Sequence, residues 1–261
     1  MPSNYAHYRF GAAMLSAMPG DIRRTAKRYR RLYDVGLHGP DLFFYYDPLR
    51  QNKFGMMGRQ IHRQPGREFF GRVCRSLRLD PSQAAEAYLY GALCHYALDA
   101  ACHPFVVEQD RQGIADHIEI ETEFDRFLLE LDGKIPPEYQ DLSPHLVLEP
   151  GDYAAIARFY PDTTGKAVER SVKNMARIIK LLAVRGKTKR DLMRNTLGMA
   201  GVEYRGFVMT SGPNPQCCAL NEPLLKLYGR AQEQFPDLLL QLCAHLTYNA
   251  PLGADFAATF G

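Results

Sequence analysis

The chain has 261 residues, of which 46% are apolar, 23% charged and 11% aromatic. These proportions are typical of a globular protein and exclude collagen-like, low-complexity and disordered chains. Thirty-two basic and twenty-nine acidic side chains leave a net charge of +3, which is too small to indicate a nucleic-acid-binding protein.

The predicted helices share one feature, a recurrence of apolar residues at helical spacing. In chain order they are Tyr5–Met18, Asp21–Asp34, Arg67–Leu79, Asp80–Cys102, Asp116–Leu131, Lys166–Val184 and Glu222–Thr247. In the fourth, Asp80 is the expected N-cap, Gln83 completes a capping box, and His103-Pro104 ends the helix. Pro236 is expected to interrupt or kink the last helix.

Strand signals are scarce, and the Gly- and Pro-rich punctuation at residues 39–40, 136–137 and 212–215 is too short for domain linkers. We therefore predict an all-α fold, a single helical domain over residues 1–261.

Sequence features also bear on the compartment. No run approaches the roughly eighteen apolar residues of a membrane-spanning helix, and the N-terminus lacks the pattern of a secretory signal. The six cysteines include no C-x-x-C pair. A reduced, cytoplasmic protein is therefore expected.

Two predicted helices carry a histidine and a carboxylate four residues apart, so that both side chains lie on one helix face. The pairs are His95 with Asp99 and His117 with Glu121, and His103 lies between them in the sequence. Nitrogen and oxygen donors in this arrangement suit a borderline-soft divalent metal ion. Taken alone, each pair is also explained by a buried histidine that belongs to the core.

Further signals lie upstream. Asp41 follows a Gly-Pro turn and precedes an aromatic run, which includes Phe43, Phe44 and Tyr45. His62 lies in a polar stretch, and His7 has apolar neighbours. Each has an ordinary alternative: Asp41 as a turn residue, His62 as a surface residue, and the aromatic run as a hydrophobic anchor.

This ordered set resembles the zinc-dependent phospholipases C, all-helical bacterial phosphodiesterases whose fold is shared by single-strand-specific zinc nucleases. The resemblance covers Tyr5 to Asp125, and the second half of the chain matches only in being helical. The matching residues are His7, the Gly39–Tyr45 block, His62, His95, Asp99, His103, His117 and Glu121.

The resemblance implies three metal positions. One would be held by Asp41, His62, His95 and Asp99. A second would be held by His103, His117 and Glu121. The third would use His7 and a bridging Asp99, and the family completes it with an N-terminal tryptophan. This chain has no tryptophan and begins six residues before His7, so two zinc ions are expected.

The function that this resemblance implies is a zinc-dependent phosphodiester hydrolase, with a phospholipid as one possible substrate. Asp41 would act as ligand and as the group that orients or deprotonates the attacking water. Phe43, Phe44 and Tyr45 would line the substrate pocket. Leu42 stands where the family places an aromatic residue against a choline group, which weakens the case for phosphatidylcholine.

Other functions stay open. A catalytically silent helical domain would keep the metals for stability or for binding a partner. A nuclease is an enzyme alternative, but no basic and aromatic groove is visible and no specific nucleic-acid partner is expected. An HD-type phosphohydrolase needs an adjacent His-Asp pair, and none occurs. The basic run Arg23–Arg31 suggests peripheral membrane contact, with a solvated helix face as the alternative.

Overall fold

The computed structural model describes residues 4–261, and residues 1–3 lie outside it. The α-helices are α1 (Asn4–Ala17), α2 (Gly20–Arg28), α3 (Arg30–Gly36), α4 (Lys53–His62), α5 (Gly66–Leu79), α6 (Gln83–Arg111), α7 (His117–Leu131), α8 (Asp152–Ala157), α9 (Gly165–Leu182), α10 (Lys187–Ala200) and α11 (Asn221–Tyr248). The 3₁₀ helices are η1 (Gly39–Tyr45), η2 (Pro137–Tyr139), η3 (Val202–Phe207), η4 (Cys218–Leu220) and η5 (Ala254–Ala257). Residues 4–261 contain no strand, so the predicted all-α class is confirmed.

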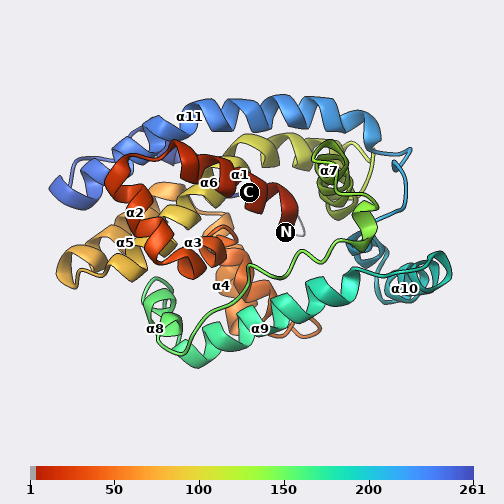
Figure 1. The fold of residues 1–261 in the computed structure, drawn as a ribbon, viewed down its shortest axis with the longest axis horizontal. Coiled ribbons are helices and arrows are strands. Elements are labelled where there is room, and N and C mark those ends of the chain that lie inside the picture. Colours follow the sequence, from red (N-terminus) through yellow and green to blue (C-terminus); the bar gives the residue numbers. More distant parts are fainter. Residues whose placement is uncertain (1–3) are drawn as a thin grey trace.

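The long helix α6 forms the centre of the molecule and spans roughly 44 Å. It is apolar nearly all round because α1, α3 and α11 pack against different sides of it. In Figure 1, α11 lies along one edge of the molecule, α9 along the opposite edge, and α10 at the end of α9. The N-terminal end of α1 lies near the middle of this view, close to α7.

Two glycines allow α3 to approach α6 closely. A Cβ atom on Gly91 would lie 2.2 Å from the backbone oxygen of Tyr33, and one on Gly36 would lie 2.4 Å from that of Tyr88. Both distances are too short for non-bonded atoms, so this crossing requires glycine on each helix. The close contact fixes the chain that leaves α3 and enters η1, which carries Asp41.

One helix end was predicted wrongly at a position that matters for the site. His103-Pro104 does not end α6, which continues to Arg111 with Pro104 inside it. Proline removes one backbone donor, and burial of the next turn, where Val106 is 2% exposed, favours continuation. His103 therefore lies within the helix, one turn after Asp99.

Other boundaries also differ from the prediction. The expected helix over 21–34 is divided at Tyr29, whose backbone (φ −109°, ψ 45°) is not helical. The N-cap of α6 is Ser82, which accepts a hydrogen bond from the amide of Ala85, and Asp80 does not fill that position. Pro236 leaves α11 uninterrupted, and α4, α8 and α10 were not predicted.

Among residues 4–261, no helix combines the length and the apolar composition needed to cross a bilayer.

Candidate metal centre

The first group of candidate ligands joins α1 to α6. His95 and Asp99 lie one turn apart on α6, and His7 of α1 faces them. Asp99 places one carboxylate oxygen 3.2 Å from His7 Nε2 and the other 3.1 Å from His95 Nε2. All three side chains are buried. Asp99 therefore links the two helices through a single carboxylate.

The second group adds residues from η1 and α4. Asp41 Oδ1 lies 2.8 Å from His62 Nε2, and both lie close to His95. His62 is the last residue of α4, and its Nδ1 donates to the carbonyl of Gly58 at 2.7 Å, which aims Nε2 at Asp41. Gly39 has φ +43°, and a Cβ there would lie 2.7 Å from the His95 ring. Glycine thus brings the Asp41 turn against His95.

The third group joins α6 to the start of α7. Glu121 Oε1 lies 3.0 Å from His103 Nε2 and 3.2 Å from His117 Nε2. The side chain of His117 is 26% exposed, which makes it the most accessible of the candidate ligands. Asp99 Oδ2 lies 4.0 Å from His103 Nδ1, so this group is continuous with the first.

The structure thus brings together all eight side chains that the resemblance implied as ligands. It groups them as His7, His95 and Asp99; Asp41, His62 and His95; and His103, His117 and Glu121.

The hydrogen bonding of these groups fits a metal centre. Although Asp41 Oδ1 and His62 Nε2 are close, neither has a hydrogen-bond partner of normal geometry. The same is true of the buried His95 Nε2, Asp99 Oδ2 and Glu121 Oε2. Buried polar atoms normally have hydrogen-bond partners. Histidine nitrogens and carboxylate oxygens are also the atoms that commonly coordinate zinc. The donor set therefore fits zinc.

Neighbouring histidines stabilise the ionised form of the buried carboxylates in these groups. Burial alone would raise the pKa of Asp99, but the neighbouring histidines His95, His103 and His7 hold it well below its usual value. Burial likewise opposes ionisation of Glu121, and His117 and His103 lower its pKa. Both carboxylates are thus ionised at neutral pH, as metal ligands must be.

The C-terminal segment contributes a support that sequence reasoning missed. His103 Nδ1 donates to the backbone carbonyl of Phe260 at 2.7 Å, and its Nε2 faces Glu121 Oε1 at 3.0 Å. The Phe260 ring is fully buried beside the rings of His62 and His95. Backbone carbonyls carry no side-chain signature, so the sequence offered no signal for this contact.

Asp125 is a second support that was missed. It lies one turn after Glu121 on α7, and its carboxylate accepts the backbone amides of Asn4, Tyr5 and Ala6 at 2.8 to 2.9 Å. A carboxylate at a helix N-terminus satisfies unpaired amides and interacts favourably with the helix dipole. Asp125 therefore fixes the start of α1, one turn before His7.

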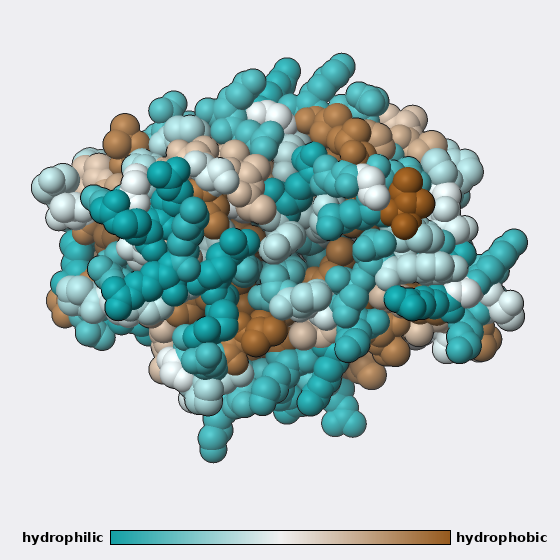
Figure 2. Space-filling model, in the orientation of Figure 1, coloured by the Kyte–Doolittle hydropathy of each residue, from teal (hydrophilic) through white to brown (hydrophobic). Residues whose placement is uncertain are grey.

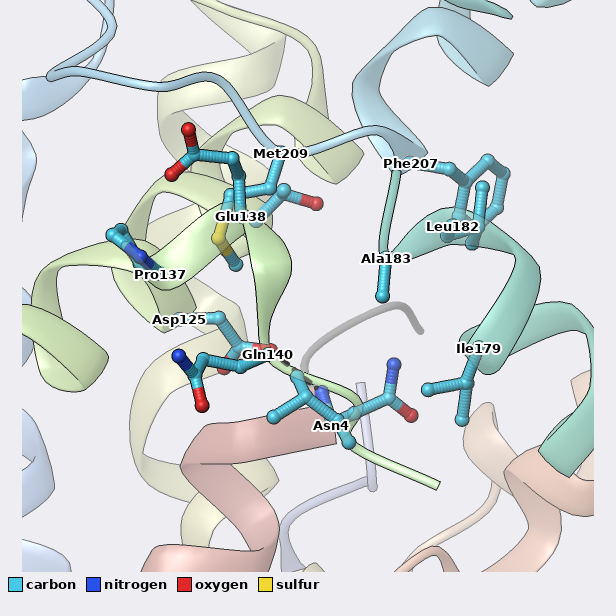
Figure 3. Close-up of a pocket in the computed structure, with 12 residues that line it drawn as sticks. Asn4, Asp125, Pro137, Glu138, Gln140, Ile179, Leu182, Ala183, Phe207 and Met209 are labelled. Carbon is cyan, nitrogen blue, oxygen red and sulfur yellow. Dashed lines mark hydrogen bonds between the residues drawn. The ribbon is translucent and has the colours of Figure 1, made fainter. Parts of the chain in front are cut away.

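A small pocket lies beside this contact. Figure 3 shows Asn4 at its base, Ile179, Leu182, Ala183 and Phe207 on one side, and Pro137, Glu138 and Gln140 across from them. Because Asn4 and Asp125 line it, the pocket and the metal ligands lie one helical turn apart on both α1 and α7. One wall is apolar and the other is polar.

The three aromatic residues expected to bind substrate lie in different places. The Phe44 ring is half-buried, 5.3 Å from the ring of His62. Phe43 is fully buried, with its ring 4.6 Å from Tyr160, so it belongs to the core. Tyr45 is buried, and desolvation together with the charge of Asp41 raises its pKa. Phe44 and Tyr45 thus lie near the Asp41 turn.

Two further histidines, the buried His38 and the half-buried His145, form a pair next to the centre. The Nε2 atoms of His38 and His145 lie 2.7 Å apart, so one must donate to the other. His145 stacks on Tyr8. Burial, with the charge of Arg30, lowers the pKa of His145 to about 4. The pair joins the Asp41 turn to the loop before α8.

This pair predicts an acid-sensitive stability. An unfolded histidine titrates near pH 6.5, so below that value the unfolded chain binds a proton that the folded His145 does not. The free energy of unfolding should fall by about 2 kcal/mol per such group between about pH 7 and pH 5. His145→Asn should reduce this loss, as measured by urea denaturation at both pH values. An equal loss in the variant would contradict the assignment.

Comparison with known proteins adds one result. The model of the family described as zinc dependent phospholipase C matches residues 6–178, about two thirds of the chain and all eight candidate ligands. The chain belongs to the zinc-dependent phospholipase C family. No curated protein and no solved structure is significantly similar to it. Residues 179–261, which include Phe260, lie outside the matched segment.

Proposed function

We propose that this member of the zinc-dependent phospholipase C family hydrolyses phosphodiesters. The observation that supports this most is the continuous set of buried histidine and carboxylate atoms that lack hydrogen-bond partners and point at one another. Such a set costs stability unless cations occupy it, because buried polar atoms and charges need compensation. Family membership makes zinc the cation to test first.

The roles of the residues follow from their positions. When bound, zinc lowers the pKa of a water molecule and neutralises phosphate oxygens. Asp41 is the carboxylate that accepts the proton of the attacking water, and His62 keeps it oriented through the 2.8 Å contact. Asp99 remains ionised and balances the charge of the site. The phosphodiester reaches the centre from the side of His117, the most exposed of these residues.

The substrate class is tested with a panel of a chromogenic phosphodiester, phospholipids of several head groups and single-stranded nucleic acid. Position 42 is a fully buried leucine and therefore offers no aromatic ring to a choline group. Release of phosphomonoester from at least one phosphodiester, abolished by chelation, is expected. Zinc-loaded protein that hydrolyses nothing in the panel would favour the silent metal-binding domain.

We expect two tightly held zinc ions per chain. The first group shares His95 with the second group, so only His7 and Asp99 serve it alone. Asp99 also lies near the third group, with Oδ2 4.0 Å from His103 Nδ1. A third ion there would lack a complete set of protein donors. Elemental analysis of protein purified without chelator checks the number. Three tightly held zinc ions would contradict this expectation.

Glu121→Ala should remove one zinc ion and leave the other. Glu121 is the only carboxylate of the third group, and the ligands at Asp41, His62 and His95 are untouched. Elemental analysis of the dialysed variant provides the measurement. Glu108→Ala is the matched control, since Glu108 pairs with Arg111 on the exposed end of α6. Full zinc content in Glu121→Ala would exclude Glu121 as a ligand.

A further inference from the structure

The C-terminal end of α9 and the helix α10 form a surface that the hydrolytic site does not use. We call this surface, residues 177–199, the α9–α10 face. It contains seven basic residues and one acidic residue, Asp191, whereas the whole chain has a net charge of +3. The net charge of this short segment thus exceeds that of the whole chain. The exposed cations are Arg177, Lys180, Arg185, Lys187 and Lys189.

These cations lack partners in the part of the chain that the structure describes. None of the five forms an ion pair there. Some exposed arginines elsewhere on the molecule are paired. Arg111, for example, contacts Glu108 at 2.9 Å, and Arg31 contacts Glu149 at 3.0 Å. The α9–α10 face therefore presents positive charge that the protein itself does not neutralise.

Apolar side chains protrude among these cations. Leu181 is 64% exposed, Leu192 66% and Met199 89%. Leu192 and Met199 are seven residues apart on α10 and so share one side of that helix, with Lys189 on the same stripe. In Figure 2, hydrophobic and hydrophilic side chains are mixed over the end of the molecule where Figure 1 places α10. The exposure of these apolar side chains to water is unfavourable, which indicates a surface that contacts a partner.

Cations that surround protruding apolar side chains match one kind of surface. A bilayer with anionic lipids attracts the lysines and arginines and accepts apolar side chains below its head groups. A nucleic acid would satisfy the charge and leave Leu192 and Met199 in water. We propose that the α9–α10 face docks on an anionic lipid bilayer.

The position of the α9–α10 face agrees with docking on a bilayer. Leu182 and Ala183, at the same end of α9, line the pocket beside Asn4 and Asp125. Docking would therefore place the apolar wall of that pocket next to the lipid. The proposal concerns binding and does not depend on hydrolysis.

The basic run Arg23–Arg31, which the sequence suggested for membrane contact, is less suitable for docking on a bilayer than the α9–α10 face. Arg24 pairs with Asp21, Arg30 with Asp34, and Arg31 with Glu149. The run lies on α2 and α3, which are separate elements from α9 and α10. It thus offers a matched control for the charge of the α9–α10 face.

Sedimentation with vesicles tests the charge. The full chain should bind vesicles of equal parts phosphatidylcholine and phosphatidylglycerol and should release them in high salt. Lys187→Gln with Lys189→Gln should weaken binding by about 25-fold, roughly fivefold for each lysine. Lys27→Gln with Arg28→Gln should change it less than about twofold. Equal binding to vesicles of phosphatidylcholine alone, or an equal loss in both double variants, would overturn the proposal.

Fluorescence tests the apolar contact. The chain has no tryptophan, so a single introduced indole reports on its own surroundings. The emission of Leu192→Trp should shift to shorter wavelength with anionic vesicles and be quenched by brominated lipid chains. Leu240→Trp, at a 70% exposed position on α11, should do neither. A shift with nucleic acid and none with vesicles, or the same shift at both positions, would overturn the proposal. Both tests read binding and not turnover, so a failure of hydrolysis leaves them intact.

Discussion

Asp41→Asn is expected to lower the rate constant of phosphodiester hydrolysis by about 100-fold or more, the scale of a positioned general base. Asparagine keeps the size of the side chain and one oxygen, but it cannot accept the proton of the attacking water. Asp41 is 2% exposed and lies 2.8 Å from His62 Nε2, so bulk water is poorly placed to replace it. Steady-state kinetics on a chromogenic phosphodiester give the measurement.

The control for this variant is Asp47→Asn. Asp47 lies just after η1 and contacts Arg170 at 3.6 Å, away from the ligand groups. It should retain the activity of the parent. Zinc held by His103, His117 and Glu121 should remain in Asp41→Asn, which separates loss of the base from loss of the centre. Parent-like hydrolysis by Asp41→Asn would mean that Asp41 is only a turn residue.

Asp125→Ala should lower the free energy of unfolding by about 3 kcal/mol or more, since hydrogen bonds to a charged group each contribute about 1.5–3 kcal/mol. The change removes the acceptor of the backbone amides of Asn4, Tyr5 and Ala6 at the start of α1. Chemical denaturation followed by circular dichroism measures it. The start of α1 would then fray, and His7 would lose its fixed position against Asp99.

Asp116→Ala is the matched control. Asp116 occupies the N-cap of α7, on the same helix, but its side chain forms no capping hydrogen bond. The free energy of unfolding should change by less than about 0.5 kcal/mol, as for most substitutions away from specific contacts. Equal losses in the two variants would show that the contact with α1 contributes little.

The candidate ligand pairs at the centre of the site could be predicted because they follow local helix geometry. Residues four apart on a helix share a face wherever the helix lies, so the pairs of α6 and α7 were readable from spacing alone. The resemblance to the zinc-dependent phospholipases C supplied His7, Asp41 and His62, which have no such local signature. Helix ends were less predictable, because burial of the turn after Pro104 outweighed the local effect of proline.

By itself the sequence determined the helical class, the candidate ligand pairs at His95 and His117, and the family. Only the tertiary structure decided how the ligands divide into groups and what holds them. Asp125 reaches the start of α1 across about 120 residues, and the carbonyl of Phe260 reaches His103 across 157. These contacts depend on the packing of distant helices and on backbone atoms that every residue shares. Spacing along a chain carries no information about either, because both arise only when the chain is folded.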